Sequence, residues 1–408
     1  MRVLIIGAGS AGLLMAHVFK KCNIDATVFE QDASPTARPR DWTFGIYWAQ
    51  SRLEECLPSE ITNRLHTVQA DPNAKPSADS VLPIYDGITG EMLSPAGAPF
   101  AVRYRRRAWL GLIGEGVDIR YGKRIAKVVT SDDGVTAIFT DGTEEKGDLV
   151  IGAEGAHSVV RDFLFESTPE DGKLLSSPIV ASATVGTMDP EVALAVRKVS
   201  NLCHITLDKN GLFTFVSTHD VSAPDPADWV FVIVMSWASY EDTSAKLKTY
   251  DQIHKDMVSR VQDLAYPFKD AITTFKPDGD RCWHARMTYW PTKPWDSRGG
   301  KVTLAGDAAH AMTFHRGQGL GNAISDAAEM LQHLRGMAEH TPAELAKAVK
   351  RYEEGMWPRG LEAVEGNLEN TVAIHNWEFV MKSPIVVKGL KKEGDKVRVN
   401  ETGAEGVE

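Results

Sequence analysis

Two glycine-containing segments far apart in the chain carry residue types that bind phosphate and hydroxyl groups. In the first, Gly7, Gly9 and Gly12 form a GxGxxG pattern directly after an apolar run, and a carboxylate follows at Glu30. The first glycine of such a pattern permits a tight turn, the second lets a pyrophosphate approach the backbone, and the third allows a helix to pack closely on a strand. The acid can bind a ribose 2′-OH, which favours FAD or NAD over NADP.

The second segment, GDAAHAMTFHRGQGLGNAISDA, spans residues 306–327 and leaves a strand-like run through Gly-Asp. A strand-end carboxylate beside a glycine, here Asp307, suits a ligand that is rich in hydroxyl groups. His310 and His315 are candidate catalytic groups in and beside the loop that follows, and Arg316 in the same loop is a candidate catalytic or substrate-binding group. The alternatives are that His315 is a polar lining residue, that Arg316 is a surface charge, and that His310 packs at the base of the loop.

The elements that must position these segments include both strands and helices. The apolar run Val3 to Ile6, the helical pattern after Gly12 and the run that ends at Glu30 predict a βαβ unit. Further along the chain, apolar residues recur on one face of a helix that begins near Gly319. A capping-box sequence with proline at its first helical position, Thr341 to Glu344, predicts another helix.

Short strands fill much of the chain between these segments. Asp86-Gly87 predicts a hairpin, and turns at Asp133-Gly134 and Asp141-Gly142 separate three strands that precede a buried one, Leu149 to Ile151. Residues from about 175 to 290 are β-rich, with one helical interruption at about 243 to 264. Because nucleotide-binding sequence stands on both sides of a β-rich block, we expect two interleaved domains.

Composition excludes several classes of function. The 408 residues carry a formal net charge of −10, which argues against nucleic acid as the main partner. The four cysteines lie far apart without metal-binding spacing, so we expect no metal site and a reducing, cytoplasmic location. No segment approaches the ~20 apolar residues of a membrane span, and the N-terminal run lacks a small-residue cleavage site.

Three motifs in this order resemble those of the class A flavoprotein monooxygenases, the para-hydroxybenzoate hydroxylase type. They are GAGSAG with Glu30, GDLVIGAEGAHSVVR at residues 147–161, and LAGDAAHAMTFHRGQGLGNAISDA at residues 304–327. The segments RPRDWTFGIYW, residues 38–48, and RRRAWL, residues 105–110, are similar to the family's mobile arginine segment and its FAD-contacting arginine. The resemblance covers about residues 1–165 and 295–360, and the β-rich block between them matches only in character.

This resemblance implies an α/β fold in which a Rossmann-like FAD-binding domain is interleaved with a β-rich substrate domain and followed by C-terminal helices. The expected parts are residues 1–70, 101–166 and 291–340 for the FAD-binding domain, 71–100 and 167–290 for the substrate domain, 341–390 for the helices, and 391–408 for a loose tail. The first substrate-domain part is the predicted hairpin.

The resemblance also assigns cofactor-binding positions. The FAD-binding residues that it implies are Gly7, Gly9, Ala11, Gly12, Glu30, Arg38, Arg40, Arg107, Glu154, Asp307, Gly317, Gly319 and Leu320. Asp307 matches the acid that binds the flavin ribityl chain, and the helix near Gly319 would direct its positive end at the anionic reduced flavin. Arg38 and Arg40 would offer charge to the coenzyme phosphates as their segment moves. The alternatives are that these two arginines neutralise the FAD pyrophosphate or lie in solvent.

Five further positions bear on the resemblance. Glu154 stands where the family usually has aspartate, and Phe314 stands where it usually has proline. Trp237, Trp283 and Tyr289 lie on strands that would face the flavin, but alternation along a strand makes a core position nearly as open for each.

The activity implied is that of an FAD-dependent monooxygenase, an oxidoreductase of secondary metabolism. NADPH or NADH would reduce the flavin, O₂ would add to form a C4a-hydroperoxide, and one oxygen atom would pass to an aromatic or polycyclic small molecule by hydroxylation or epoxidation. The alternatives are a reductase or dehydrogenase, a halogenase, and a non-catalytic nucleotide-binding regulator. The Trp-x-Trp-x-Ile-Pro stretch usual in halogenases is absent from the sequence. We expect a monomer or homodimer.

Overall fold

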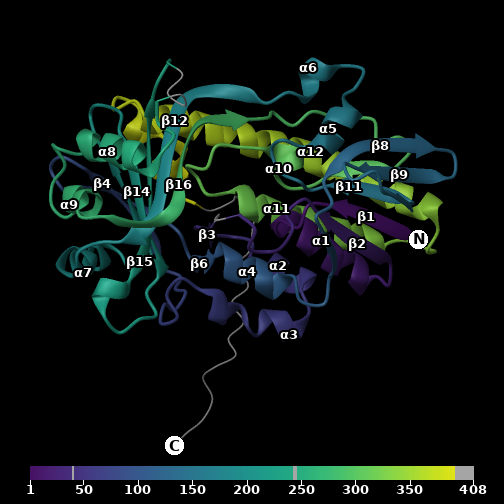
Figure 1. Ribbon diagram of the computed structural model, residues 1–408, viewed down its shortest axis with the longest axis horizontal. Helices are drawn as coiled ribbons and strands as arrows, with labels where there is room; N and C mark the ends of the chain where they lie inside the picture. Colours follow the sequence, from purple (N-terminus) through teal and green to yellow (C-terminus); the bar gives the residue numbers. More distant parts are fainter. Residues whose placement is uncertain (39–40, 242–245, 391–408) are drawn as a thin grey trace, which may run out of the picture.

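Two large sheets dominate the structure, a computed structural model that describes residues 1–38, 41–241 and 246–390. Figure 1 shows the two sheets on opposite sides of the molecule, with the N-terminus beside one of them and the long helix α12 reaching toward the other. A parallel sheet, a β-rich half and C-terminal helices together confirm the predicted α/β class. Within the described ranges, no helix is long and apolar enough to cross a membrane.

The first sheet is parallel and has the strand order β17-β11-β1-β2-β7. Its strands are β1 (Arg2–Ile6), β2 (Asp25–Glu30), β7 (Asp118–Tyr121), β11 (Leu149–Gly152) and β17 (Val302–Leu304). The central strands read as continuous apolar runs because both faces of the sheet are covered. Helix α1 (Ser10–Lys21) connects β1 to β2, which confirms the predicted βαβ unit.

Different layers cover the two faces of this parallel sheet. On one face, α1 packs against α11 (Gly319–Arg335). On the other lies an antiparallel sheet of β8 (Ile125–Ser131), β9 (Gly134–Phe139) and β10 (Glu144–Gly147), as the two Asp-Gly turns predict. The rings of Phe29 and Phe139 meet between these layers with centroids 4.9 Å apart.

The second large sheet has seven strands in the order β16-β12-β15-β14-β13-β4-β5, antiparallel except between β13 and β4. Its strands are β4 (Val81–Asp86), β5 (Met92–Gly97), β12 (Leu175–Thr187), β13 (Cys203–Leu207), β14 (Phe213–Asp220), β15 (Val230–Ala238) and β16 (Lys276–Tyr289). The predicted hairpin at Asp86-Gly87 is confirmed as β4–β5, which joins a sheet otherwise built from residues beyond 174.

The expectation of one helical interruption in the β-rich block is wrong. Three helices interrupt it: α7 (Pro190–Val199), α8 (Tyr250–Arg260) and α9 (Phe268–Thr273). In α7, proline follows an extended Asp189, and Val192, Ala193 and Val196 form a buried helical face. The three helices share one apolar core with the outer face of the seven-stranded sheet, which leaves the other face toward the rest of the molecule.

A two-stranded sheet lies between the two large ones. It pairs β3 (Thr43–Ile46) with β6 (Val102–Arg105), and Thr43 contacts Ser217 of β14 through their hydroxyl oxygens, 3.2 Å apart. The remaining helices are α2 (Gln50–Cys56), α3 (Ser59–Thr62), α4 (Arg106–Ile113), α5 (Val159–Leu164), α6 (Pro169–Gly172), α10 (Asp307–His310) and α13 (Pro384–Lys388), with 3₁₀ turns η1 (Leu65–Val68), η2 (Pro226–Asp228) and η3 (Val380–Lys382).

Helix α12 (Pro342–Ile374) is the longest element and links the two halves (Figure 1). The Thr341 side chain caps it by accepting a hydrogen bond from the backbone N–H of Glu344, as predicted. The helix packs along α11 and ends beside β15, where the C-cap residue His375 contacts Ser236. The tail expected at 391–408 lies outside the described residues.

Candidate functional site

The three glycines of the first motif have different surroundings. Gly7 follows β1 with a φ of 105°, and a Cβ atom there would lie 2.6 Å from the carbonyl oxygen of Ala153. An added Cβ at Gly12 would overlap the carbonyl oxygen of Gly7. An added Cβ at Gly9 would meet no atom within 4 Å, although Gly9 is the N-cap of α1. Packing therefore requires two of the glycines, whereas the space over Gly9 is open to a phosphate at the helix N-terminus.

Glu30 at the end of β2 holds this loop in place. Its Oε2 accepts a hydrogen bond of 2.8 Å from the backbone N–H of Ala8, and its Oε1 accepts one of 2.9 Å from Asp32. Each carboxylate oxygen keeps a further lone pair, so a ribose hydroxyl can still bind there. The first and last motifs also meet, because a Cβ atom at Gly306 would lie 2.6 Å from the Cβ of Ala11.

Asp307 lies where these two motifs meet, and its carboxylate is free. The side chain is exposed, and it has no hydrogen-bond or ion-pair partner among the described residues. Burial of the carboxyl among protein atoms nevertheless raises the pKa of Asp307, which the nearby His310 partly offsets. The carboxylate is thus accessible yet partly desolvated, and a hydroxyl-rich ligand such as the ribityl chain of FAD fits its chemistry.

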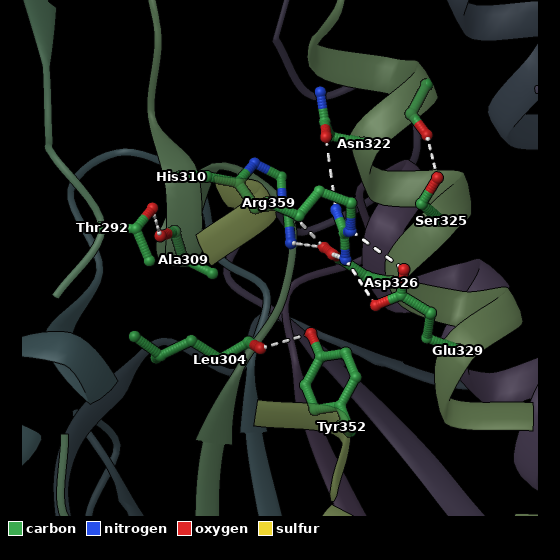
Figure 2. Close-up of polar contacts among 12 residues, drawn as sticks. Thr292, Leu304, Ala309, His310, Asn322, Ser325, Asp326, Glu329, Tyr352 and Arg359 are labelled. Atoms are coloured by element: carbon green, nitrogen blue, oxygen red, sulfur yellow. Dashed lines mark hydrogen bonds and ion pairs between the residues drawn. The ribbon is translucent and has the colours of Figure 1, made fainter. Parts of the chain in front are cut away.

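The backbone at Asp307 is held by a buried charge network (Figure 2). Asp326 Oδ2 accepts from the backbone N–H of Gly306 at 2.7 Å and lies 2.8 Å from His310 Nε2. Arg359 Nη2 donates to Asp326 Oδ1 at 2.8 Å and to Glu329 Oε2 at 2.9 Å. Burial alone would raise the pKa of Asp326, but the neighbouring His310 and Arg359 hold it below its usual value. His310 is thus a packed residue at the base of the loop, as one of the two sequence interpretations has it.

The N-terminus of α11 faces Asp307. A Cβ atom at Gly319, the first residue of the helix, would lie 3.8 Å from Asp307 Oδ1 and touch nothing closer. Gly317 has a φ of 58°, and its Cα side packs against the ring of Tyr47, which an added Cβ would approach to 2.8 Å. Leu320 is partly buried. The positive end of the helix dipole thus lies next to the accessible carboxylate and the open space around it.

Two of the three predicted arginines, Arg38 and Arg107, lie together at the segment that follows β2. Arg38 pairs with Asp32 at 2.7 Å, and Arg107 Nη2 donates to the carbonyl oxygen of Arg38 at 2.9 Å. The Nε of Arg107 is buried without a partner in the described part of the chain, so it can still donate to a phosphate. Arg40 lies outside the described residues, and its assignment stays a prediction.

Glu154 turns toward α5 rather than toward the open space. Its Oε1 accepts a hydrogen bond of 2.9 Å from the backbone N–H of Val160, near the start of that helix. Its Oε2 is buried with no partner in the described ranges, and burial raises the pKa of the carboxyl. The observed role is to bind the N-terminus of α5, and a role in cofactor binding stays a prediction.

His315 belongs to a closed chain of buried hydrogen bonds. His375 Nδ1 donates to the carbonyl oxygen of Thr371 at 2.6 Å, so in the neutral ring Nε2 accepts from Ser236 Oγ at 2.9 Å. Ser236 Oγ also lies 3.0 Å from His315 Nε2, and His315 Nδ1 lies 2.8 Å from Thr371 Oγ1, whose hydroxyl donates to the carbonyl oxygen of Asn367 at 2.8 Å. Burial holds the pKa of His315 well below its usual value and lowers that of His375 to about 4, which keeps both rings neutral.

This chain joins the loop after Asp307 to α12 and β15. Both ring nitrogens of His315 are engaged within the protein, so the structure favours the lining interpretation, and a catalytic role stays a prediction. Arg316 packs along α12, where an added Cβ at Gly366 would lie 3.4 Å from its Nη1. Burial lowers the pKa of Arg316, and Glu369 opposes the shift. The side chain is buried, and its Nε has no hydrogen-bond partner in the described part of the chain, so Arg316 is not a surface charge.

One face of the seven-stranded sheet is directed toward Asp307 and the loop that follows it. Phe215, Val234, Ala183 and Trp283 stand directly opposite one another across four strands, so their side chains share a face. Phe215 packs against the same core as the parallel sheet, and 38% of the Trp283 surface is exposed. Trp237 belongs to the opposite face, in the core with α8. Strand register therefore decides which of the two candidate tryptophans can face a ligand.

Comparisons with known proteins identify the family. A family model described as an FAD binding domain matches residues 112–355. The FAD-dependent monooxygenase cctM of Talaromyces islandicus is 44% identical over 391 residues, 96% of this chain and 97% of cctM. The chain belongs to the FAD-dependent monooxygenases. It is therefore an oxidoreductase with FAD as its cofactor, and the glycine motif, Asp307 and the N-terminus of α11 form a cradle whose chemistry fits that cofactor.

A second relative and two solved structures are also similar to this chain. The monooxygenase phnB of Penicillium herquei is 34% identical over 398 residues, 95% of this chain and 94% of phnB. The structure of Klebsiella pneumoniae HpxO complexed with FAD and uric acid matches with a TM-score of 0.73 and 19% identity over 96% of this chain and 93% of HpxO. P. aeruginosa PqsL in complex with 2-aminobenzoylacetate matches with a TM-score of 0.72 and 18% identity over 94% of this chain and 99% of PqsL. At these identities the solved structures show a shared fold.

Several residues of this monooxygenase that hold the site were not identified from the sequence. One group supports the Gly-Asp turn and the other joins the loop to the sheet: Asp326, Glu329 and Arg359 in the first, and Ser236, Thr371 and His375 in the second. A signal existed for the first group, because Asn322, Asp326 and Glu329 follow one another at helical spacing beside the apolar face of α11. No local signal marks the second group, whose members meet only through the packing of distant elements.

Proposed function

We propose that this monooxygenase uses NADPH or NADH together with O₂ to hydroxylate or epoxidise an aromatic or polycyclic small molecule of secondary metabolism. The observation that carries the proposal is the free, accessible carboxylate of Asp307 between the open Gly9 loop and the N-terminus of α11. When bound there, FAD supplies the redox chemistry, accepting electrons from the nicotinamide and activating O₂. Overall, one oxygen atom goes to the substrate and the other leaves as water with two electrons and two protons.

The residues of the chain would bind, orient and exclude water. Asp307 accepts hydrogen bonds from ribityl hydroxyls, and the N-terminus of α11 stabilises negative charge by about 1 kcal/mol. Phe215, Val234 and Trp283 present an apolar wall on the facing sheet, and the small side chain of Ala183 leaves room between them. An apolar wall suits a flat hydrocarbon-rich substrate and keeps bulk water from the reacting atoms.

Product analysis under labelled oxygen tests the reaction. With the FAD-loaded enzyme, NADPH or NADH, and a panel of aromatic and polycyclic compounds, an accepted substrate should accelerate coenzyme oxidation and yield a product that contains one ¹⁸O atom from ¹⁸O₂. Labelled water in place of labelled O₂ should leave the product unlabelled. Coenzyme oxidation that yields a reduced or dehydrogenated product without the label would instead establish a reductase or dehydrogenase.

Substitution of Asp307 tests the cofactor position. Asp307→Ala should purify without flavin yet remain folded, because the carboxylate has no partner among the described residues and its removal breaks no internal contact. Asp307→Asn keeps an oxygen acceptor and should retain more FAD. The thermal midpoint of each flavin-free protein should equal that of the flavin-free wild type. A fully yellow Asp307→Ala variant with normal turnover would show that this motif does not bind the ribityl chain.

A further inference from the structure

A cavity of about 240 Å³ lies beside the two-stranded sheet. Residues of β6, α2, α3 and η1 line it, and β6, α2 and α3 lie together in Figure 1. Most of its wall is apolar, with Leu53, Leu65, Pro76, Phe100 and Val102 among the side chains that form it. An apolar space of this size can hold a small organic molecule.

The cavity is on the face of this small sheet that points away from the seven-stranded sheet. Side chains alternate along a strand, and Val102 and Tyr104 of β6 line the cavity. Arg105, on the other face of β6, forms an ion pair with Asp220 of β14. The cavity is therefore separate from the region between Asp307 and the seven-stranded sheet.

An aromatic pair separates the cavity from the glycine loop. The ring of Tyr104 stacks on that of Trp109, with centroids 5.3 Å apart and an angle of 7° between the planes. Trp109 Nε1 in turn donates to Ser10 Oγ at 3.0 Å, at the first residue of α1. A ligand in the cavity contacts Tyr104, whereas Trp109 contacts the loop that is expected to bind the pyrophosphate.

The hydroxyl group of Tyr104 has no hydrogen-bond partner among the described residues. Only 4% of the residue surface is exposed, and hydroxyl groups at such positions are normally hydrogen-bonded. Burial raises the pKa of Tyr104, and the nearby Glu54 carboxylate adds to the shift, so the phenol stays neutral. It can therefore donate one hydrogen bond to a ligand and accept another.

Two other polar side chains of the wall offer acceptors. Gln50 Nε2 donates to two carbonyl oxygens, the nearer of which is that of Phe100 at 2.8 Å. Thr62 Oγ1 donates to the carbonyl oxygen of Ser59 at 3.2 Å. With these protons engaged, the amide oxygen of Gln50 and the hydroxyl oxygen of Thr62 remain as acceptors, so the cavity favours a ligand that donates.

Phe100 gives the cavity an aromatic wall in an uncommon backbone conformation. Its φ is 54°, in the left-handed region that bulky residues rarely adopt. The hydrogen bond from Gln50 holds its carbonyl group in this conformation. Backbone outliers of this kind cluster at ligand sites, and the face of an aromatic ring attracts a cation.

The charge of the wall decides which ligand fits. Glu54 is the only charged side chain among the described residues that line the cavity, and it is exposed on α2. A bound carboxylate would be repelled by Glu54, with no cation of the wall to offset the repulsion. An ammonium group would be attracted, and its three protons can bind Glu54, Tyr104 and a further acceptor.

The volume limits the rest of the ligand. A cavity of about 150 Å³ is sufficient for a benzene molecule, so this one holds a single ring with a short chain. We propose that it binds a small protonated amine that carries one ring, an arylalkylamine, with the ammonium group between Glu54 and Tyr104. The ring then packs against Leu53, Leu65 and Phe100. Because the site lies outside the cofactor cradle, it is independent of the proposed monooxygenase reaction.

Calorimetric titration of the FAD-loaded protein with model ligands tests the site. At pH 7 the probes are 2-phenylethylamine, the neutral 2-phenylethanol and the anionic phenylacetate. Wild-type protein should bind the amine with a dissociation constant of about 1 mM or lower, the alcohol about fivefold more weakly, and the carboxylate more weakly still. Glu54→Gln keeps the shape of the side chain and should remove the preference for the amine over the alcohol. Tyr104→Phe removes one oxygen atom and should weaken amine binding about fivefold.

Two controls separate this site from a general effect of charge or folding. Glu55→Gln removes the neighbouring carboxylate of α2, which does not line the cavity, and should leave amine binding unchanged. Leu65→Trp fills the cavity and should abolish binding of the amine. Because Glu54 is exposed, Glu54→Gln tests the site even where Leu65→Trp fails to fold.

Three results would overturn the proposal. The first is a wild-type protein that does not bind 2-phenylethylamine more tightly than both 2-phenylethanol and phenylacetate. The second is a Glu54→Gln variant that keeps the full preference for the amine. The third is a folded Leu65→Trp variant that binds the amine as wild type does, which would place the amine in another part of the molecule. None of these measurements uses NADPH or O₂, so their outcome is independent of the labelled-oxygen test of the reaction.

Discussion

Asp326 and Gly306 are joined by a hydrogen bond of 2.7 Å in which the backbone N–H of the glycine donates to the buried carboxylate. The φ of Gly306 is 61° and its ψ is −144°, a conformation that residues with a side chain rarely adopt. The turn that presents Asp307 is therefore held by a residue of helix α11. Arg359 completes the arrangement from α12, so three elements determine where one carboxylate points.

Asp326→Asn should weaken both the fold and FAD binding. The substitution removes the charge that faces Arg359 and His310 in the protein interior, and breaking a buried ion pair on one side costs about 3 kcal/mol. Urea unfolding of the flavin-free protein measures the first effect, and FAD titration of the same protein measures the second. Glu365→Gln on the exposed side of α12 is the matched control and should change neither. Unchanged FAD affinity in Asp326→Asn would show that the network does not position the Gly-Asp turn.

Gly12→Ala should lower the stability of the protein, whereas Gly9→Ala should lower its affinity for FAD. The added methyl at Gly12 overlaps the carbonyl oxygen of Gly7, so this variant should lose about 2 kcal/mol of stability or fail to fold. The methyl at Gly9 meets no protein atom within 4 Å, and the φ of −77° there suits alanine, so the flavin-free Gly9→Ala protein should unfold at the wild-type midpoint. Its FAD affinity should nevertheless fall about tenfold or more, a loss of about 1.4 kcal/mol. Wild-type FAD affinity in Gly9→Ala would show that the pyrophosphate does not lie over this residue.

The segment 38–48 should move during turnover, and Arg40 tests its function. If Arg40 offers charge to the coenzyme phosphates, Arg40→Ala should slow flavin reduction by NADPH or NADH about tenfold while FAD affinity stays near normal. Stopped-flow reduction at saturating substrate measures this rate, and Arg64→Ala, which removes an exposed arginine, is the control. Loss of FAD in proportion to the loss of rate would instead assign Arg40 to the FAD pyrophosphate. Asp41 beside it accepts a hydrogen bond from the backbone N–H of Arg107, which is a contact that such a motion must break.

Glu353 should make the stability of this enzyme depend on pH. Burial raises the pKa of this carboxyl from 4.5 to about 7, while the Trp295 indole, which donates to its Oε1 at 2.8 Å, partly offsets the shift. The folded state therefore holds a proton that the unfolded state has lost, and the free energy of unfolding should decrease as pH rises from about 4.5 to about 7, by up to about 3 kcal/mol. Glu353→Gln keeps the acceptor and removes the titration, so its thermal midpoint should decline less over this range. Parallel midpoint curves for the two proteins would contradict the assignment.

Local patterns were sufficient to predict the elements around the cofactor. The glycine spacing and the apolar run before it predicted the βαβ unit, and Thr341 and Pro342 predicted the start of α12, because turns and helix caps depend on neighbours in sequence. Asp307 was identified for the same reason. The fold class and the family were also predicted from short motifs, which the resemblance assigns to one cofactor.

Contacts between distant elements were not predictable in this way. Arg103 and Phe215 meet because β6 packs against β14, and Ser236 and His315 meet because α12 and the loop reach the sheet together. The two tryptophans make the same point. Alternation along a strand shows that each of Trp237 and Trp283 lies on one of the two faces of the sheet. Only the pairing of β12 with β15 and β16 shows which tryptophan lies on which face.

Helix α12 acts as a strut between the two halves of the molecule. At Arg359 it is tied to Asp326 beside the parallel sheet, and at its end His375 is tied to Ser236 in the seven-stranded sheet. The helix between these two ties is about 24 Å long and resists compression along its axis. A movement that changes the separation of the two sheets must therefore break one of these two contacts. The distance between the two sheets is therefore set by a helix that belongs to neither of them.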